Sequence, residues 1–154
     1  EYGSSLDPAV PRPAYLELDA EADPFDGAWL GPTDPEPDGF LASSMRRWFR
    51  FARPLGDDAT LHATMLAYAT DMTGLGARPL QLDESHGIEG IVSLDHAVHF
   101  HRPTRADQWL LYDVTSTINT GGRGLLRGHV YTEDGTHVAS VTQETLLWDP
   151  AVGR

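Results

Sequence analysis

The sequence contains no cysteine and no lysine, and both absences narrow the chemistry open to it. Without cysteine there are no disulfides, no thiolate nucleophile and no cysteine-ligated metal. All eleven basic residues are arginines, against 23 acidic residues, so the formal charge is −12 at pH 7. Such a surplus of negative charge repels phosphate backbones, so nucleic acid is not an expected partner.

Long apolar runs are absent as well. No stretch reaches the roughly 18 consecutive apolar residues of a membrane-spanning helix. The sequence also shows neither the basic and apolar segments of an export signal nor a C-terminal peroxisomal tripeptide, so the cytoplasm is the expected location. With 154 residues, 40% of them apolar, the chain has the length of one globular domain.

The composition changes near Gly39. Residues 1–40 hold seven prolines and ten acidic residues against the single Arg12, which gives a net charge of −9. Proline removes backbone donors and like charges repel, so long regular elements are disfavoured there. We predict an extended, partly disordered arm over residues 1–40 and a folded domain over residues 41–154. The apolar side chains expected to dock the arm in places are Tyr15, Leu16, Phe25, Trp29 and Leu30.

The folded part begins with a strand and a helix. Aromatic and charged residues mix over residues 46–52, as in a half-exposed strand. A helix is predicted over residues 60–70, with Asp57 and Asp58 as candidate N-caps. Because this helix is apolar nearly all round, we expect it to be buried. The residues expected to end it are Gly74, Gly76 and Pro79.

Strands fill the rest of the sequence. They are predicted over residues 88–100, 109–117, 125–132 and 136–148. Gly121–Gly122 separates the second of these from the third, and Asp134–Gly135 predicts a type I′ hairpin turn, which needs positive φ. A strand, a helix and four antiparallel strands together predict an α+β fold in which one sheet wraps a single helix.

Three histidines, His96, His99 and His101, lie within six residues and raise the question of a metal site. On a regular strand His99 and His101 share a face while His96 lies on the other. No glutamate follows closely, as a His-x-His metal site would require. We therefore predict structural histidines that pair with carboxylates, and no metal centre.

Signatures of nucleophilic hydrolases are missing too. There is no Gly-x-Ser-x-Gly elbow. Ser93, Asp95 and His96 lie too close together on one strand to converge as a triad. The glycine-rich residues 122–128 have the wrong spacing for a phosphate-binding loop and run into a strand.

Two polar residues stand out by their position. Asp71 is an isolated carboxylate at the C-terminal end of the predicted helix, where the helix dipole disfavours an anion. Such a charge indicates either a functional group or an exposed last turn. Gln143 shares its strand face with Val141 and Thr145, so its amide points to an apolar side and needs partners there. The alternative is a glutamine that binds a neighbouring backbone group.

Five blocks of the sequence, in this order, resemble the acyl-CoA thioesterase II family, and in particular the second repeat of its double-hotdog members. They are Tyr68–Asp71, Ser93–Pro103, Trp109–Tyr112, Gly122–Gly124 and Val138–Glu144. The most specific strings are Asp-His-x-x-x-Phe-His-Arg-Pro and Ala-Ser-x-x-Gln-Glu. The resemblance implies a hotdog fold, an antiparallel sheet wrapped around one long helix, in agreement with the plan above.

The resemblance also implies an activity, the hydrolysis of an acyl-CoA or acyl-carrier-protein thioester by water without a covalent acyl-enzyme. By motif position, the residues that activate the water are Asp71, Ser93 and Gln143. A carboxylate can accept a proton from water while a hydroxyl and an amide fix its orientation. The reaction that the resemblance implies needs no metal or redox cofactor, and coenzyme A enters only as part of the substrate.

The sequence matches one repeat of a two-repeat family, so a second copy or a separate hotdog subunit is expected to cover the sheet edge and the helix face. Two alternatives stay open. One is a non-catalytic hotdog subunit that binds an acyl thioester or completes a partner's active site. The other is a hotdog dehydratase or cyclase of a biosynthetic pathway, which ranks lower because the expected aspartate and histidine motif is not found.

Two points depend on the fold. Simple alternation places Ser93 with His99, opposite the more apolar face of Val92 and Val98, so a β-bulge is needed to turn Ser93 toward that face. Surface arginines in an acidic protein mostly pair with carboxylates, so none is assigned to the phosphates of coenzyme A. The candidates are Arg46, Arg47, Arg102, Arg105, Arg123 and Arg127.

Overall fold

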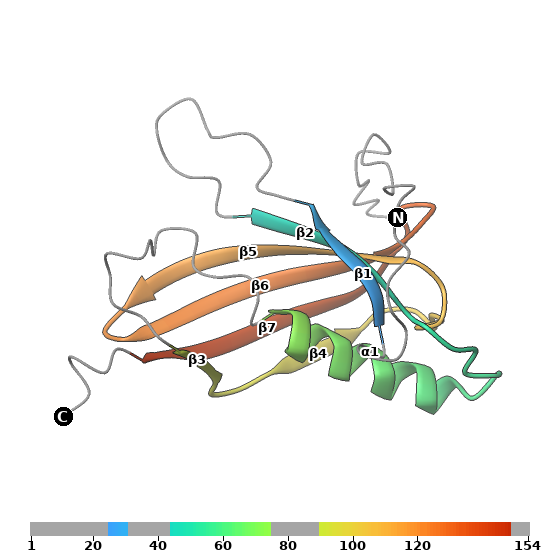
Figure 1. The fold of residues 1–154 in the computed structure, drawn as a ribbon, viewed down its shortest axis with the longest axis horizontal. Coiled ribbons are helices and arrows are strands. Elements are labelled where there is room, and N and C mark those ends of the chain that lie inside the picture. The colour runs from blue at the N-terminus through green and yellow to red at the C-terminus, as the bar shows by residue number, and fades with distance from the viewer. Residues whose placement is uncertain (1–24, 31–43, 75–89, 149–154) are drawn as a thin grey trace.

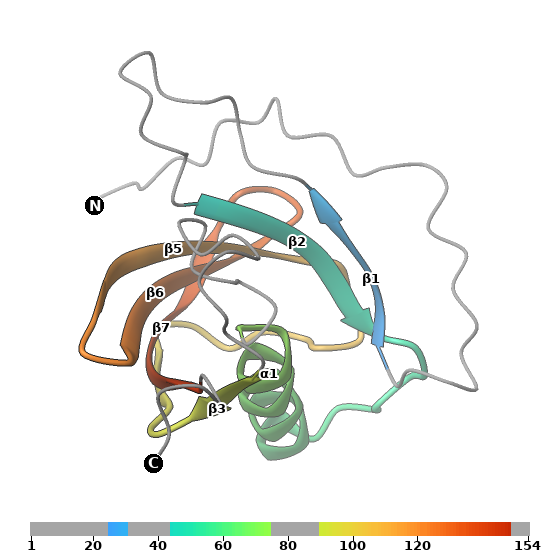
Figure 2. The same ribbon diagram turned by 60° about the vertical axis from the view of Figure 1, so that its left-hand side comes forward.

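One helix and one sheet make up the part of the chain that the computed structural model describes, residues 25–30, 44–74 and 90–148. The elements are β1 (Phe25–Leu30), β2 (Ser44–Phe51), α1 (Ala59–Gly74), β3 (Gly90–Ser93), β4 (Ala97–Phe100), β5 (Leu110–Thr120), β6 (Arg123–Thr132) and β7 (His137–Trp148). The strands form an antiparallel sheet in the order β1-β2-β5-β6-β7-β3, and β4 also pairs with β7. The sheet curls around α1 (Figures 1 and 2), which is the predicted α+β arrangement.

The main core lies between the concave face of the sheet and α1. Alternate residues of β5, namely Leu110, Tyr112 and Val114, point into it and are at most 1% exposed. Leu66 and Ala69 of α1 meet them from the other side. A second buried cluster lies apart from this core and consists of Trp48, Trp109, Leu111 and Tyr131. Burial of such apolar side chains is the main term that holds the helix in the sheet.

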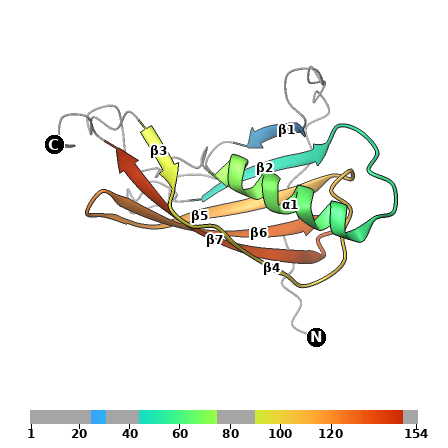
Figure 3. The same ribbon diagram turned by 90° about the horizontal axis from the view of Figure 1, so that it is seen from below.

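The helix starts where the sequence predicts but is less covered than expected. Asp58 is the N-cap, since its Oδ1 accepts hydrogen bonds from the backbone N–H groups of Thr60 (2.9 Å) and Leu61 (3.3 Å). The prediction of a buried helix is wrong, because the sheet lies on one side of α1 only (Figure 3) and several apolar side chains of the helix are exposed. Leu61, Tyr68 and Met72 are 38%, 48% and 53% exposed. Gly74 is the last helical residue, whereas Gly76 and Pro79 lie outside the described residues.

A short strand, β1, lies within the segment predicted to be an extended, partly disordered arm. It contains no proline and pairs along its whole length with β2, with Phe25 opposite Phe51. The Phe25 ring is 3% exposed and lies against the rings of Phe49, Phe51 and Tyr68. Burial of this ring confirms the docking expected of Phe25, and the six residues pair with β2 as a regular strand despite the acidic residues around them. Tyr15 and Leu16 lie outside the described residues, and the division at residue 40 stays a prediction.

Both predicted hairpins form, with one correction. Gly121 and Gly122 have φ of 59° and 73° and join β5 to β6, as a two-residue type I′ turn requires. Between β6 and β7 only Gly135 has a positive φ, of 83°, and its N–H donates to the carbonyl of Thr132 (2.9 Å). The type I′ prediction for Asp134–Gly135 is therefore wrong, because Asp134 keeps a negative φ and the loop is longer than two residues.

The strand predicted over residues 88–100 is interrupted by a bulge, and residues 88 and 89 lie outside the described part. The N–H groups of Leu94 and Asp95 both approach the carbonyl of Glu144, at 2.8 and 3.4 Å, and Asp95 Oδ1 accepts a hydrogen bond from the Glu144 N–H (2.7 Å). The register accordingly shifts by one residue between the Ser93–Thr145 pair and the Val98–Val141 pair. The bulge turns Ser93 to the same face as Val98, as the site needs.

Among the described residues no helix is long and apolar enough to cross a membrane.

Candidate active site

The three residues singled out by sequence meet in one hydrogen-bonded cluster, although they lie 22, 50 and 72 residues apart in the chain. Ser93 Oγ donates to Asp71 Oδ1 at 2.9 Å. Gln143 Nε2 lies 2.5 Å from the same carboxylate oxygen and 2.8 Å from Ser93 Oγ. A helix end, an edge strand and a central part of the longest strand therefore supply one residue each.

Asp71 is held by the last part of α1. The preceding residue, Thr70, is fully buried, and its hydroxyl contacts the carbonyls of Leu66 and Ala67 (both 3.0 Å) and His96 Nε2 (3.2 Å). This contact ties the end of the helix to the segment between β3 and β4. The helix dipole disfavours an anion here, and the two donors on Oδ1 offset part of that cost. Asp71 is half-buried and bonded, so the alternative of an exposed last turn is wrong.

Ser93 is the last residue of β3 and immediately precedes the bulge. Its hydroxyl donates to Asp71 and accepts from Gln143, which uses the two-way hydrogen bonding of a hydroxyl group. The nearby His96 bonds to Thr70 instead of Ser93. Within residues 44–74 and 90–148, Ser93 therefore has no imidazole bonded to it of the kind that a serine nucleophile requires.

Gln143 comes from the inner face of β7, between the buried residues Val141 and Thr145, and is 0% exposed. Its Nε2 reaches two side chains of the cluster, so the alternative of a backbone-binding glutamine is wrong for this group. Its Oε1 is buried and has no hydrogen-bond partner within the described part of the chain. The amide thus faces the site with its nitrogen end.

Tyr112 is a fourth polar group at the inner wall, and sequence reasoning gave it no role. It is fully buried, and its hydroxyl, like Gln143 Oε1, has no partner among the described residues. Burial, and next the negative charge of Asp71, raise the pKa of the Tyr112 hydroxyl, so it stays protonated. The sequence did contain an indication of its position. Tyr112 belongs to one of the motif blocks and alternates with the apolar Leu110 and Val114 along a predicted strand.

Two of the three histidines singled out by sequence have other partners than the predicted carboxylates. His96 contacts the Thr70 hydroxyl, and His101 Nε2 contacts Ser140 Oγ at 2.8 Å. The partners of these two rings are hydroxyls, so the prediction of carboxylate partners is wrong for them. The His137 ring lies beside both His101 and His129, with centroid distances of 4.8 and 5.1 Å. No group of histidine and acidic side chains in the described segments has the geometry to hold a metal ion.

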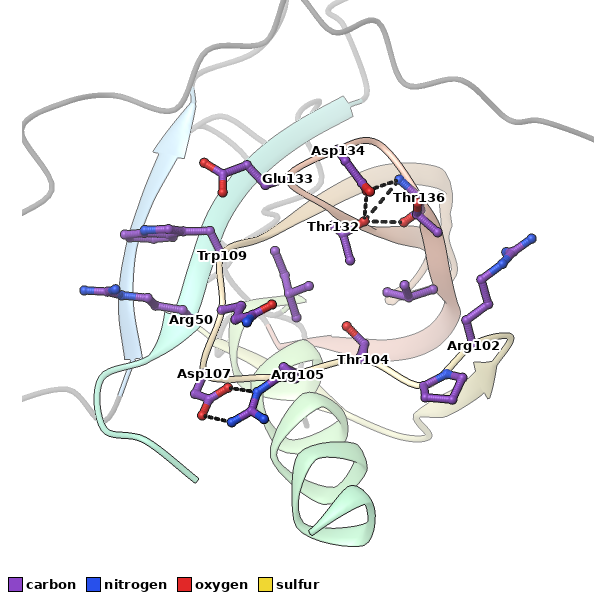
Figure 4. A pocket seen from close by; sticks show the side chains of 14 residues that line it. Arg50, Arg102, Thr104, Arg105, Asp107, Trp109, Thr132, Glu133, Asp134 and Thr136 are labelled. Atoms are coloured by element: carbon purple, nitrogen blue, oxygen red, sulfur yellow. Dashed lines mark hydrogen bonds and ion pairs between the residues drawn. The ribbon is translucent and has the colours of Figure 1, made fainter. Parts of the chain in front are cut away.

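A separate pocket of about 610 Å³ opens at the other end of the helix (Figure 4). Thr104, Arg105 and Asp107 line it, and Arg105 also binds the carbonyl of Gly56 just before α1 (2.8 Å). Asp71 lies twelve residues along the helix from its first residue, or about 18 Å. None of the three cluster residues lines this pocket.

Among the described residues, at least three of the six candidate arginines pair with carboxylates, as expected. The pairs are Arg46 with Asp113 (3.1 Å), Arg105 with Asp107 (3.0 Å) and with Asp57 (2.8 Å), and Arg123 with Glu144 (3.2 Å). Arg102 instead donates to the carbonyl of His137 at 2.6 Å.

A curled antiparallel sheet around one helix, with a polar cluster where the helix end meets the sheet, defines a hotdog-fold protein of the thioesterase type. The chain belongs to the acyl-CoA thioesterase C-terminal domain family, whose sequence pattern matches residues 5–147.

Its similarity to individual proteins agrees with this. Acyl-coenzyme A thioesterase 8 from Homo sapiens is 36% identical over 101 residues, which is 65% of this chain and 32% of that protein. Acyl-CoA thioesterase 2 from Haemophilus influenzae is 26% identical over 140 residues, 90% of this chain and 49% of that protein. The crystal structure of the acyl-CoA thioesterase II TesB2 from Mycobacterium marinum superposes with a TM-score of 0.82 and 38% identity, over 98% of this chain and 58% of that one. The chain spans a third to a half of the length of these curated relatives.

Proposed function

We propose that this chain hydrolyses acyl-CoA thioesters at the Asp71–Ser93–Gln143 cluster. The observation that carries the proposal is the mutual hydrogen bonding of three residues from distant parts of the chain, in a family of acyl-CoA thioesterases. A half-buried carboxylate with two fixed donors on one oxygen is a suitable general base. The relatives' names support acyl-CoA as the substrate class, and an acyl-carrier-protein thioester has the same reacting group.

In the proposed reaction, Asp71 removes a proton from a water molecule. The hydrogen bonds from Ser93 and Gln143 both go to Oδ1 of the carboxylate, so Oδ2 is the oxygen that takes this proton. The water oxygen forms a bond to the thioester carbonyl carbon, and the C–S bond of the tetrahedral intermediate then breaks. The leaving thiolate takes up the proton, and the products are a carboxylic acid and free coenzyme A.

Ser93 and Gln143 orient the carboxylate and the water in this scheme. Gln143 Nε2 and Ser93 Oγ hold Oδ1 in place, so that Oδ2 keeps one direction relative to the incoming carbonyl carbon. Such pre-organisation lowers the entropy cost of bringing water, base and thioester together.

The proposal is tested by following free-thiol release from short-, medium- and long-chain acyl-CoAs, with an acyl-carrier-protein thioester as a further substrate. The expected result is saturable release of thiol together with an equal amount of free fatty acid. Thiol release without acid would indicate acyl transfer, and no release from any of these thioesters by folded protein would contradict the proposal. The chain-length profile of kcat/KM would then define the substrate.

A second candidate is a hotdog subunit whose site works only together with a partner. It is favoured by the exposed apolar side chains of α1, Leu61, Tyr68 and Met72, which a second copy of the chain or another hotdog unit would cover. Thiol release that appears only on mixing with such a partner would support this candidate over the first. The dehydratase or cyclase alternative has no observation in the described residues that favours it.

A further inference from the structure

Tyr112 is the largest fully buried side chain of the described residues, and its position depends on a glycine beneath it. A Cβ atom added to Gly128 would lie 2.2 Å from Tyr112 Cε2 and 2.7 Å from both Cζ and the hydroxyl oxygen. The absence of a side chain at Gly128 therefore lets the phenol ring lie flat across β6. The hydroxyl end of the ring thus lies over Gly128 of β6, the strand between β5 and β7.

The register of the sheet shows what the ring approaches there. Gly128 is paired with Val141 of β7, and Gln143 is the next residue of β7 on the same face, about 7 Å further along. Asp71, which is bonded to Gln143, also acts electrostatically on the Tyr112 hydroxyl. The phenol end of Tyr112 and the amide of Gln143 thus face one small region inside the sheet.

The unpaired atoms of these two residues are complementary. The Tyr112 hydroxyl is a protonated donor, and Gln143 Oε1 is an acceptor, and both are buried without a partner among the described residues. Native proteins seldom leave such atoms unpaired, and two of them beyond direct reach of each other are commonly joined by one ordered water with polar groups on both sides.

We propose that Tyr112 is a positioning residue, which binds Gln143 Oε1 through one water molecule and so holds the amide with Nε2 toward Asp71 and Ser93. A rotated amide would place Oε1 against the Asp71 carboxylate, two acceptors facing each other, and would release the carboxylate oxygen. The consequence for turnover rests on the proposed function, whereas the link between Tyr112 and Gln143 does not.

The test is a double-mutant cycle between Tyr112→Phe, which removes only the hydroxyl, and Gln143→Met, which keeps the side-chain length and removes both polar ends. Tyr112→Phe is expected to lower kcat about tenfold with little change in KM, because the buried phenol does not touch substrate. In the Gln143→Met variant, Tyr112→Phe should lower kcat by a much smaller factor. Tyr131→Phe, a buried tyrosine of the second cluster, is the matched control and should leave kcat within about twofold.

Urea unfolding of wild type, the two single variants and the double variant measures the coupling between Tyr112 and Gln143 independently of activity. The two substitutions are expected to shift the unfolding midpoint by less together than the sum of their separate shifts. Additive midpoint shifts, or a Tyr112→Phe effect on kcat as large in Gln143→Met as in wild type, would overturn the inference. If wild type releases no thiol, the proposed function fails, while the unfolding cycle still decides the role of Tyr112.

Discussion

At the scale of single residues, the hydroxyl of Ser93 makes two hydrogen bonds that an apolar side chain cannot make. It donates one to Asp71 and accepts one from Gln143. We expect Ser93→Ala to lower kcat about 10- to 100-fold, because both the carboxylate and the amide lose a fixed partner. Ser93→Thr keeps the hydroxyl on a β-branched residue suited to a strand and should retain most of the activity. Steady-state kinetics on one acyl-CoA checks both, and equal activity of the alanine and threonine variants would argue against this role.

The residues of the cluster could be named from sequence, but their contacts could not. Asp71 was marked by a charge at the wrong end of a helix, and Gln143 by an amide on an apolar strand face. Ser93 came from the motif alone, since simple alternation put it on the other face. Tyr112 has an inward position that the pattern shows, yet its role follows from an unpaired hydroxyl and from the space above Gly128, which only the packing reveals.

At the scale of elements, the bulge after Ser93 is the feature that makes the site. The Asp95 carboxylate stabilises the bulge by accepting a hydrogen bond from the Glu144 N–H. Because of the extra residue, the inner face carries the odd-numbered Ser93 before the bulge and the even-numbered Val98 after it. A period-two pattern cannot reveal one extra residue in a strand, so the sequence predicted one strand where the structure has β3 and β4. The β1 strand was missed for another reason, because its acidic and proline-rich surroundings masked a six-residue stretch without proline.

The connection between the loop before β5 and the start of α1 gives a prediction on pH. Asp107 bonds to Arg105 and accepts the Leu55 N–H (2.9 Å), and above all the Arg105 hydrogen bond lowers the pKa of its carboxyl from 3.8 to about 2. The unfolded chain therefore binds more protons between these values. The stabilisation is present above pH 3.8 and is lost as the pH falls toward 2.

Asp107→Asn should accordingly lower stability at pH 7 and weaken the loss of stability between about pH 4 and pH 2. Urea unfolding at a series of pH values measures both effects. Asp57→Asn is a suitable control. The Asp57 side chain bonds to the same arginine but is 97% exposed, so it should contribute little to the free energy of unfolding. A parallel pH dependence of Asp107→Asn and wild type would contradict this account.

At the scale of the whole molecule, the exposed apolar side chains of α1 give a prediction about self-association. With Leu61, Tyr68 and Met72 exposed, we expect the 154-residue chain to form at least a dimer at micromolar concentration, with a mass that is a multiple of 16.9 kDa by light scattering. The Leu61→Gln/Met72→Gln double variant should shift the mass toward the single chain, since glutamine keeps the helix and removes apolar surface. Ile118→Gln, 54% exposed on β5, is the control. A wild-type chain that stays at 16.9 kDa over this range would refute the expectation.

The overall fold was largely predictable, because hairpin glycines and strand periodicity fix the antiparallel order from β5 to β7, and a capped alanine-rich segment predicts α1. The extent to which the helix is buried was not predictable. An apolar sequence does not show whether the rest of the same chain covers each face of the helix. Leu66 and Ala69 of α1 pack into the core, whereas Leu61 and Met72 of the same helix are exposed.

The central claim is that Asp71 activates water for thioester hydrolysis, and Asp71→Asn tests it most directly. Asparagine keeps Oδ1 as acceptor for Ser93 and Gln143 but cannot take a proton, so kcat on an acyl-CoA should fall about 100- to 10,000-fold with the fold intact by circular dichroism. Asp113→Asn, at the Arg46 ion pair, is the matched control and should remain active. A folded Asp71→Asn protein that releases thiol at the wild-type rate would contradict the account.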